Sequence, residues 1–197
     1  MTAASLTALL VRAVVLAIVL PIAASHAEIT MRDYKLTDGM GPHDVAPAPD
    51  GGVWFTAQPQ GLLGRLDPAS GVAAIIEPPT PRSGPRRAWA DSRGRIWVSE
   101  WNAGNVALYD PAATTWQTWH LPGAHPQAYA VFVDDQDIVW LSDWGANALV
   151  RFDPKSEAFT AFPSPRPHAG VRQLLGRHGE VWGAESGTDR LVVLKTE

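Results

Sequence analysis

The chain of 197 residues contains no cysteine, which excludes disulfides, thiolate nucleophiles, zinc–thiolate sites and iron–sulfur sites. Charged residues are also few, at 18%, and 16 Lys and Arg stand against 20 Asp and Glu. The resulting net charge of −4 offers no basic excess to which nucleic acid could bind. Apolar residues make up 46% of the chain and nine residues are Trp, so disorder is excluded and one domain with a substantial core is predicted.

The chain also lacks an apolar run long enough to cross a bilayer, which needs about 20 residues. Its longest run covers twelve residues, 13–24, and follows Arg12. Ser25 and Ala27 then place small residues at −3 and −1 of a cut before Glu28, which is the layout of a secretory signal peptide. We therefore interpret residues 1–27 as a cleaved leader rather than a membrane anchor. Residues 28–197 are then expected in a bacterial periplasm.

An internal repeat of 42 or 43 residues organises the rest of the chain. Four tryptophans recur at spacings of 43, 43 and 42, and three Asp-Pro pairs recur at 43 and 43: Trp54, Trp97, Trp140 and Trp182; Asp67-Pro68, Asp110-Pro111 and Asp153-Pro154. In the second repeat, turn residues separate four strand-like segments at 87–90, 95–99, 106–109 and 117–120. No segment after residue 27 has a helical period. Four-stranded units repeated at this length are typical of propeller blades, so we predict an all-β propeller of four repeats.

The two ends of the repeat region suggest how the propeller is completed. The last repeat has three predicted strands, the third at 191–195, whereas residues 29–36 (ITMRDYKL) resemble the fourth strand of a repeat. We predict that residues 29–36 pair with the last repeat and close its free edge. Because bulky Trp residues resist the wide angle between blades in a ring of four, we favour an open arc or a homodimer over a closed ring.

One position of the repeat, three residues after the landmark Trp, is mostly acidic. It holds Ala57 in the first repeat, then Glu100, Asp143 and Glu185. Strand ends near a propeller axis would bring these carboxylates together, and such a group would bind a hard cation such as Mg²⁺ or Ca²⁺. The alternative is that each acid caps its own turn or meets a neighbouring Arg.

Residues that open the first strand of each repeat form a second candidate set. Eleven residues before the Trp stand His43, Arg86 and Tyr129, and Arg172 stands ten before Trp182. His43 is the candidate general base, because its pKa lies near neutrality. Trp101 and Trp144, each four residues after a landmark Trp, are candidate ligand-binding residues together with Arg86. The landmark tryptophans are interpreted as packing between blades, and His26, His120, His125, His168 and His178, which match no repeat position, as solvated.

At this point the repeats resemble those of the streptogramin (virginiamycin B) lyases. The segments GPHDVAPAPDGGVWFTA, RIWVSEWNAGNVALYDP and VWLSDWGANALVRFDP are similar to the lyase pattern PHGI…G-x-[LIV]-W-F-T-E-x-x-x-N-x-I-G-R over about residues 28–197. The family is seven-bladed, and this chain shows four repeats. The resemblance implies Mg²⁺-dependent elimination that opens the lactone of a cyclic depsipeptide antibiotic, with a histidine as base and axial acids as metal ligands.

The resemblance carries over to individual positions unequally. Glu185 lies close to the position of a metal-binding acid, and His43 occupies a Pro-His position in the first repeat. The two histidine positions of the last blades hold Tyr129 and Arg172, neither of which is a suitable base near neutral pH.

Three functions are therefore open from the sequence. The first is a lyase-like propeller using His43, Tyr129 and Arg172, with Mg²⁺ on Glu100, Asp143 and Glu185, and with weak or absent turnover. The second is a binding propeller that holds a small molecule or cyclic peptide through Trp101, Trp144, Arg86 and Arg172. The third is lactone hydrolysis, which would need a metal cage that includes Asn102, Asn105 or Asn147.

Overall fold

The computed structural model describes residues 29–197, so the predicted leader, residues 1–27, lies outside the described part. Residues 34–197 form one compact unit of antiparallel strands. Within residues 29–197 the one short helix is a 3₁₀ turn, η1 (Gln58–Gln60). No helix in this range is long and apolar enough to span a membrane.

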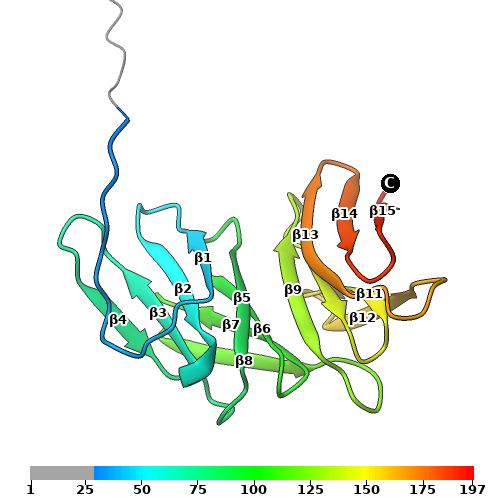
Figure 1. Ribbon diagram of the computed structural model, residues 1–197, viewed down its shortest axis with the longest axis horizontal. Helices are drawn as coiled ribbons and strands as arrows, with labels where there is room; N and C mark the ends of the chain where they lie inside the picture. Colours follow the sequence, from blue (N-terminus) through cyan, green and yellow to red (C-terminus); the bar gives the residue numbers. More distant parts are fainter. Residues whose placement is uncertain (1–28) are drawn as a thin grey trace, which may run out of the picture. The chain divides into compact units, whose positions relative to one another are not determined.

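Four sheets follow one another along the chain, and in each the strands lie side by side in sequence order (Figure 1). The first sheet contains β1 (Asp44–Pro47), β2 (Val53–Ala57), β3 (Leu62–Leu66) and β4 (Ala73–Ile76). The second contains β5 (Pro85–Ala90), β6 (Ile96–Glu100), β7 (Asn105–Asp110) and β8 (Thr115–His120). The third contains β9 (Ala128–Val133), β10 (Val139–Asp143), β11 (Ala148–Asp153) and β12 (Ala158–Pro163). The fourth contains β13 (Val171–Arg177), β14 (Glu180–Glu185) and β15 (Arg190–Lys195).

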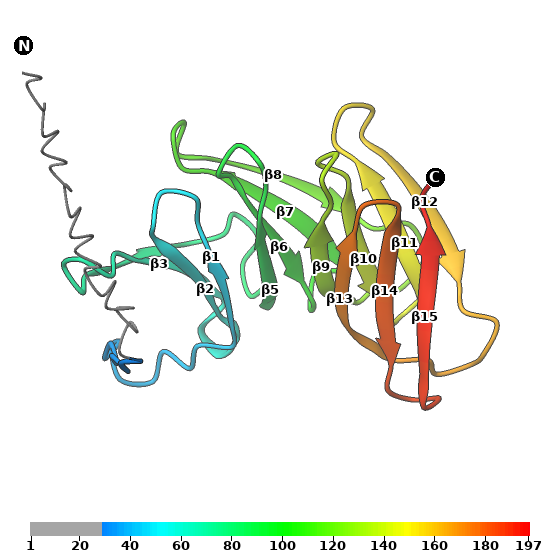
Figure 2. The same ribbon diagram turned by 90° about the horizontal axis from the view of Figure 1, so that it is seen from above.

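These sheets confirm the predicted all-β propeller architecture of four repeats. The four strands predicted in the second repeat are all present, and their bounds differ from the prediction by one or two residues. Neighbouring sheets pack through their first strands, since β1 contacts β5, β5 contacts β9, and β9 contacts β13. Within residues 34–197 the first and fourth sheets lie at opposite ends of this series (Figures 1 and 2), so the four sheets form an open arc.

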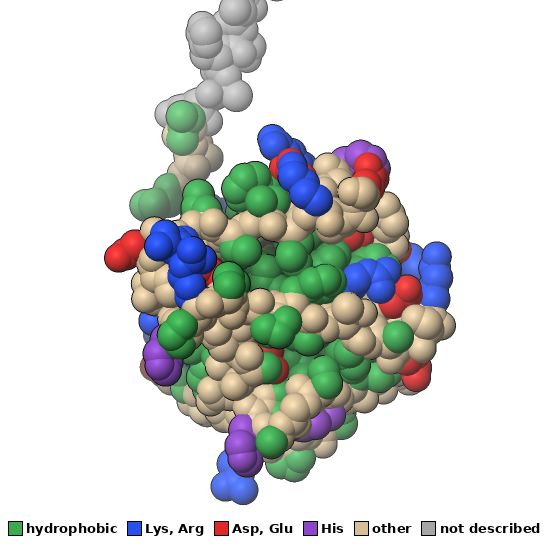
Figure 3. Space-filling model, turned by 90° about the vertical axis from the view of Figure 1, so that its right-hand side faces the viewer, with side chains coloured by type: hydrophobic (Ala, Val, Ile, Leu, Met, Phe, Trp, Pro, Cys, Tyr) green, Lys and Arg blue, Asp and Glu red, His purple; other side chains and the backbone are tan. Residues whose placement is uncertain are grey.

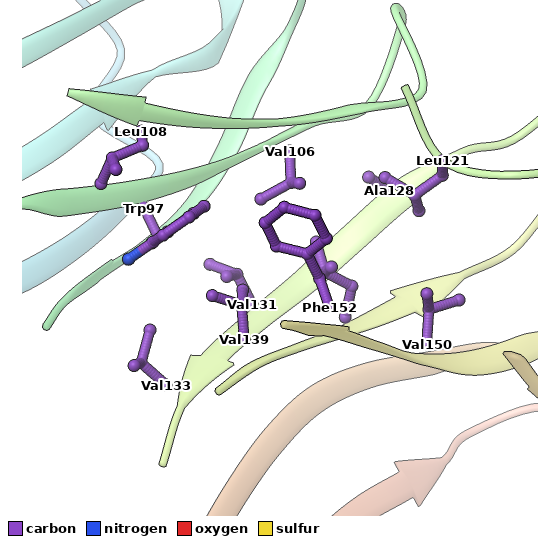
Figure 4. Packing of buried hydrophobic residues seen from close by; sticks show 11 residues of the cluster. Trp97, Val106, Leu108, Leu121, Ala128, Val131, Val133, Val139, Val150 and Phe152 are labelled. Atoms are coloured by element: carbon purple, nitrogen blue, oxygen red, sulfur yellow. The ribbon is translucent and has the colours of Figure 1, made fainter. Parts of the chain in front are cut away.

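The core between the second and third sheets shows how the repeat position of the Trp is used. Trp97 and Val106 from the second sheet meet Val131, Val139 and Phe152 from the third (Figure 4), and all five are buried. The Trp97 ring lies 5.9 Å from the Phe152 ring, edge to face. Burial of each such side chain stabilises the fold by about 1.5–3 kcal/mol. The interpretation of the landmark tryptophans as packing between blades is thus confirmed here.

A repeated acid orients the landmark tryptophans. The indole N–H donates to Asp91 from Trp97, over 3.3 Å, and to Asp134 from Trp140, over 2.8 Å. Each acid stands six residues before its Trp and also accepts backbone N–H groups of the turn between the first two strands. A single side chain therefore fixes both the turn and the ring that packs on the next sheet.

The turn that follows each second strand ends in the left-handed backbone region. Its residues occupy one repeat position and have φ of 71°, 66°, 52° and 56°: Gly61, Gly104, Asn147 and Asp189. Gly, Asn and Asp are the residues that adopt this conformation at least cost. At Gly104 a side chain is excluded as well, because a Cβ atom would lie 2.5 Å from the Pro126 carbonyl oxygen.

The prediction that residues 29–36 complete the fourth sheet is wrong within one chain. These residues form no strand, and β13, β14 and β15 form a sheet of three in the described part of the molecule. The reason lies in Tyr34 and Leu36, which are held at the first sheet. Tyr34 Oη donates to the Pro68 carbonyl oxygen over 3.0 Å, and Leu36 packs against buried Met40 and Phe55.

Candidate functional site

A β-bulge at the start of three first strands positions the candidate site. In the second sheet, Arg86 and Arg87 lie between the pairs Pro85–Glu100 and Ala88–Val98, opposite the single residue Ser99. The pairs that flank the bulges in the third and fourth sheets likewise leave two residues opposite one: Tyr129 and Ala130 opposite Ser142, and Arg172 and Gln173 opposite Ala184. A bulge bends its strand and re-aims one side chain. Arg86, Tyr129 and Arg172 are each the first residue of a bulge.

The three bulge residues, two tryptophans and His43 form one connected cluster of side chains, which we call the cation–aromatic row: His43, Arg86, Trp101, Tyr129, Trp144 and Arg172. The Arg86 guanidinium lies 3.9 Å from the Tyr129 ring centroid and 5.2 Å from the Trp101 ring centroid. One Arg86 nitrogen also donates to Tyr129 Oη over 2.9 Å. The structure thus brings together every residue predicted from the sequence as catalytic or ligand-binding.

The aromatic rings connect the two cationic ends of the row. Tyr129 and Trp144 stack with centroids 4.9 Å apart and planes 11° apart, and Trp101 meets both rings edge to face at 5.4–5.5 Å. At the far end the Arg172 guanidinium lies 5.1 Å from the Trp144 ring centroid. Trp144 Nε1–H donates to the Val171 carbonyl oxygen over 2.7 Å, which fixes the ring across the boundary between the third and fourth sheets. The rings are preorganised, so a ligand would not need to order them.

His43, at the other end of the row, is held with one nitrogen free. Its Nδ1 lies 2.9 Å from the Arg86 carbonyl oxygen. Because a carbonyl can only accept, Nδ1 carries the proton and Nε2 of the neutral ring carries the lone pair. Partial burial, and then the charge of Arg86, lower the pKa of His43 below 6.5. Near neutral pH the ring is therefore uncharged and can accept a proton.

Tyr129 is surrounded by cations. Burial raises the pKa of its phenol, but the hydrogen bond from Arg86 and the charges of Arg86, Arg172 and Arg87 outweigh this and bring it below 10.0. In the structure the phenol acts as a hydrogen-bonding group that accepts from Arg86.

The three predicted metal ligands occupy equivalent strand ends, and each forms hydrogen bonds with groups close to it. Asp143 Oδ1 accepts the backbone N–H groups of Gln127, Gly145 and Ala146 at 2.8–3.2 Å. Glu185 accepts the hydroxyls of Ser164 and Thr188, at 2.9 and 2.8 Å. Glu100 Oε2 accepts Asn105 Nδ2 over 3.0 Å. These bonds are those of the capping alternative.

The acids do not form a shared metal site in this chain. Within residues 29–197 no three His, Asp or Glu side chains lie close enough to hold a metal ion. Glu100 Oε1 and Asp143 Oδ2 are buried without a hydrogen bond, but they belong to different sheets. Burial raises the pKa of Glu100 above 4.5, against the effects of Asn105 and of nearby Ser83, whose hydroxyl lies outside hydrogen-bond geometry. The residues present do not fit a Mg²⁺ site made of the three repeat acids.

A polar relay that the sequence analysis missed leads from Glu100 to the surface. Glu100 accepts from Asn105 Nδ2, and Asn105 Oδ1 lies 2.9 Å from His120 Nδ1. His120 and His125 face an open hollow that Trp101 also lines. His120 was read as solvated because it matches no repeat position. Strand register could have identified it, since Glu100 pairs with Asn105 and Asn105 with His120 across three adjacent strands.

A second hollow lies on the other side of Trp144, between the third and fourth sheets. It encloses about 160 Å³, and Phe162 of β12 and Val192 and Leu194 of β15 line it together with Asp143 and Glu185. Figure 3 views the molecule from the side of β12 and β15, where hydrophobic side chains gather around a hollow. Trp144 therefore separates this apolar cavity from the cation–aromatic row.

The asparagines proposed for a hydrolase cage have structural partners instead. Asn102 and Asn147 donate to the carbonyl oxygens of Arg82 and Arg166, at 3.2 and 2.7 Å, and thereby fix loops. Asn105 belongs to the relay described above. This use of the asparagines gives no support to lactone hydrolysis.

With this geometry described, comparison with known proteins identifies the family. Residues 21–194 match the model of the Virginiamycin B lyase family. The chain belongs to the virginiamycin B lyase family. Comparison with curated proteins finds no match.

Solved structures of family members have the same fold. Virginiamycin B lyase from Staphylococcus aureus superposes with a TM-score of 0.77 at 21% identity, covering 84% of this chain and 56% of that one. A catalytically inactive variant of that lyase, solved with quinupristin, gives the same values. A streptogramin B lyase gives a TM-score of 0.70 at 20% identity, covering 79% of this chain and 55% of that one. The chain thus spans little more than half the length of these relatives.

Proposed function

We propose that the chain binds a cyclic-peptide lactone of the streptogramin B type on the cation–aromatic row and turns it over weakly or not at all. The observation that carries this proposal is the convergence of the six row residues, of which three, Arg86, Tyr129 and Arg172, are placed by bulges. Guanidinium groups can donate to the many carbonyl oxygens of such a ligand, and the half-buried rings of Trp101 and Trp144 offer it apolar surface. Family membership and the quinupristin complex of a relative support this ligand class. In this proposal binding takes place in the periplasm, to which the predicted leader directs the chain.

The lack of efficient elimination follows from two features. The bulge positions nearest the rings hold Tyr129 and Arg172, and neither takes a proton readily near neutral pH. The acids that could hold an electrophilic metal are separate and engaged by their turns. The geometry therefore gives more support to ligand binding than to catalysis.

Binding is tested by titrating the purified chain with quinupristin and following tryptophan fluorescence, with and without MgCl₂. We expect saturable binding that Arg172→Ala and Trp144→Ala weaken at least about tenfold, the effect of losing an interaction worth about 1.4 kcal/mol. Arg166→Ala, which removes an exposed loop arginine outside the row, is the matched control and should leave the affinity unchanged. Absence of saturation, or equal affinity of the Arg172→Ala variant and the parent, contradicts the proposal.

A slow elimination with His43 as base is the second candidate. It is favoured by the position of His43, whose Nδ1 is fixed by the Arg86 carbonyl and whose pKa is lowered. The base would remove the Cα proton of the residue whose Cβ carries the ester oxygen. The Cβ–O bond would then break, the carboxylate would leave, and a double bond would form between Cα and Cβ. Chromatography of quinupristin incubated with parent and His43→Ala chains tests it. Product formed by the parent alone supports His43, whereas robust turnover that survives His43→Ala requires another base.

A further inference from the structure

The fourth sheet presents an apolar face with no sheet against it. Leu175, Trp182 and Leu191 lie on this face and are 51%, 38% and 75% exposed. In the third sheet the same repeat positions, Phe132, Trp140 and Leu149, are only 6%, 3% and 5% exposed. There they pack against the fourth sheet. The open face therefore has the residues of an inter-sheet contact without the following sheet.

The first sheet shows the complementary feature on its opposite face. One side chain of the first strand packs against the preceding sheet. In the second, third and fourth sheets this residue is Ala88, Val131 and Leu174, with exposures of 2%, 4% and 1%. Its equivalent in the first sheet, Val45, is 64% exposed. The two ends of the arc thus carry the two halves of one recurring contact.

Residues 34–36 occupy the position of a chain that arrives from a preceding sheet. Leu36 lies 85 residues before Leu121, one fewer than two repeats of 43, so the two are counterparts only with one residue deleted; Leu121 is buried where β8 leads into the third sheet. The same separation relates Tyr34 to Trp119, which packs on Phe152 of the next sheet, and Tyr34 itself reaches Pro68 of the first sheet. The residues before it alternate in strand fashion, and Ile29 and Met31 are 99% and 98% exposed.

We propose that two copies of the chain associate head to tail, each packing its first sheet on the open face of the other's fourth sheet. Residues 29–35 of each copy then form the missing fourth strand along β15 of the other. Applied twice about a twofold axis, this heterologous contact closes into a pair and leaves no β15 edge exposed. A second copy is the favoured occupant because the chain itself carries a sheet face with the matching repeat positions and a strand-like segment beside it.

One internal contact is not reproduced across the proposed interface, which limits its strength. Thr56, Ser99 and Ser142 each donate a hydroxyl to a carbonyl oxygen of the next sheet, at 2.6–2.9 Å. The fourth sheet has Ala184 at this position. Each contact between copies therefore lacks one buried hydrogen bond, and we expect the pair to dissociate on dilution.

The pairing also completes the row, a consequence that rests on the proposed function. Successive row residues interact at an interval of 43, His43 with the Arg86 carbonyl and Arg86 with Tyr129. If the same interval continued from one copy into the other, His43 of the other copy would lie beside Arg172. The ligand surface of one copy is then extended by a residue of the other.

Sedimentation velocity over a dilution series, without ligand, tests the association. We expect the parent at twice the mass of one chain, and Trp182→Glu at the mass of one chain, with the dissociation constant raised at least about 30-fold. Thr118→Glu places the same charge on an exposed position of β8 and should leave the pair intact. A parent that stays single at every concentration, or forms species heavier than a pair, overturns the proposal.

Cross-linking tests the head-to-tail register, because the chain has no cysteine of its own. Val106 pairs with Trp119 between β7 and β8, so a Tyr34 that takes the place of Trp119 would lie opposite Leu191 of the other copy, the counterpart of Val106. Mixing the single variants Tyr34→Cys and Leu191→Cys under oxidation should give a disulfide-linked pair that neither variant gives alone. The mixture of Leu191→Cys with Lys155→Cys, an exposed position in the turn between β11 and β12, should not cross-link. A pair by mass without this cross-link overturns the register.

Quinupristin titration of the Trp182→Glu chain separates the two proposals. Several-fold weaker binding by the single chain supports a row shared between copies. Equal affinity overturns the sharing and leaves ligand binding by one copy standing, and absence of binding by the paired parent contradicts the proposed function alone.

Discussion

Two sets of residues are close neighbours in the second, third and fourth sheets, but their side chains make different contacts. One set is the acids that end β6, β10 and β14, and the other is the bulge residues of β5, β9 and β13. Glu100, Asp143 and Glu185 pair in register with the residue just before each bulge residue. Successive side chains of a strand point to opposite faces of the sheet. The arginine or tyrosine of the bulge, one position after the partner of the acid, therefore points away from the buried carboxylate. The acids bond within or beside their own sheets, whereas the bulge residues meet across sheets.

This difference shows that equivalence in a repeat does not by itself predict convergence. Carboxylates at one repeat position would repel one another around an axis unless a cation held them. Here turn N–H groups, hydroxyls and an amide bond at least one oxygen of each acid locally. Arginine and aromatic side chains attract one another, since a guanidinium over a ring is stabilised, and so they can share one surface.

The largest expected change in stability comes from replacing Asp143, one of the acids that bond locally. Asp143→Ala removes the side-chain acceptor of three backbone N–H groups, and we expect a loss of about 1–3 kcal/mol in the free energy of unfolding. Quinupristin affinity at a temperature where the variant is folded should not change. Urea denaturation measures the first quantity and fluorescence titration the second. Asp143→Asn keeps one acceptor oxygen and should lose less stability, so equal losses in the two variants would contradict a capping role.

Much of the fold could be predicted from the sequence because the repeat is explicit. The Trp positions fixed the number of sheets, and turn residues fixed the strands of the second repeat. Residues 29–36 show what the pattern could not decide. Their alternation predicted a strand, but these residues form none in the structure, and no local feature says whether β15 of the same chain lies within reach.

The candidate site was predicted in part for a similar reason. His43, Arg86, Tyr129 and Arg172 were found because they occupy equivalent positions at the starts of first strands. The contacts of these residues with Trp101 and Trp144 depend on bulges, and no residue type in this chain predicts where a bulge occurs. His120 was missed because its partners, Asn105 and Glu100, become neighbours only through strand register.

A smaller effect is expected at Glu100, whose pKa burial raises. Because its folded pKa lies above the unfolded value of about 4.3, this carboxyl contributes its full stabilisation below that value. The contribution is lost as pH rises through the folded pKa. Glu100→Gln should therefore gain stability relative to the parent above that pH, on the order of 1 kcal/mol. Urea denaturation from pH 4 to pH 8 measures this difference, and a parent advantage that grows with pH would contradict the assignment.

The smallest effect, and the one that bears most directly on the row, is the titration of His43. Partial burial and the Arg86 charge should hold its pKa below 6.5, so that it is neutral at the pH where a base would act. His178 provides an internal control of opposite sign, because its hydrogen bond to Asp135 and the nearby Glu197 raise its pKa. NMR titration of the imidazole resonances should show His43 deprotonating at clearly lower pH than His178. Arg86→Gln should move the His43 midpoint upward by removing the neighbouring charge while leaving His178 in place. If His43 titrates together with His178 in the parent, the imidazole is not influenced by the row, and its candidacy as a base is lost.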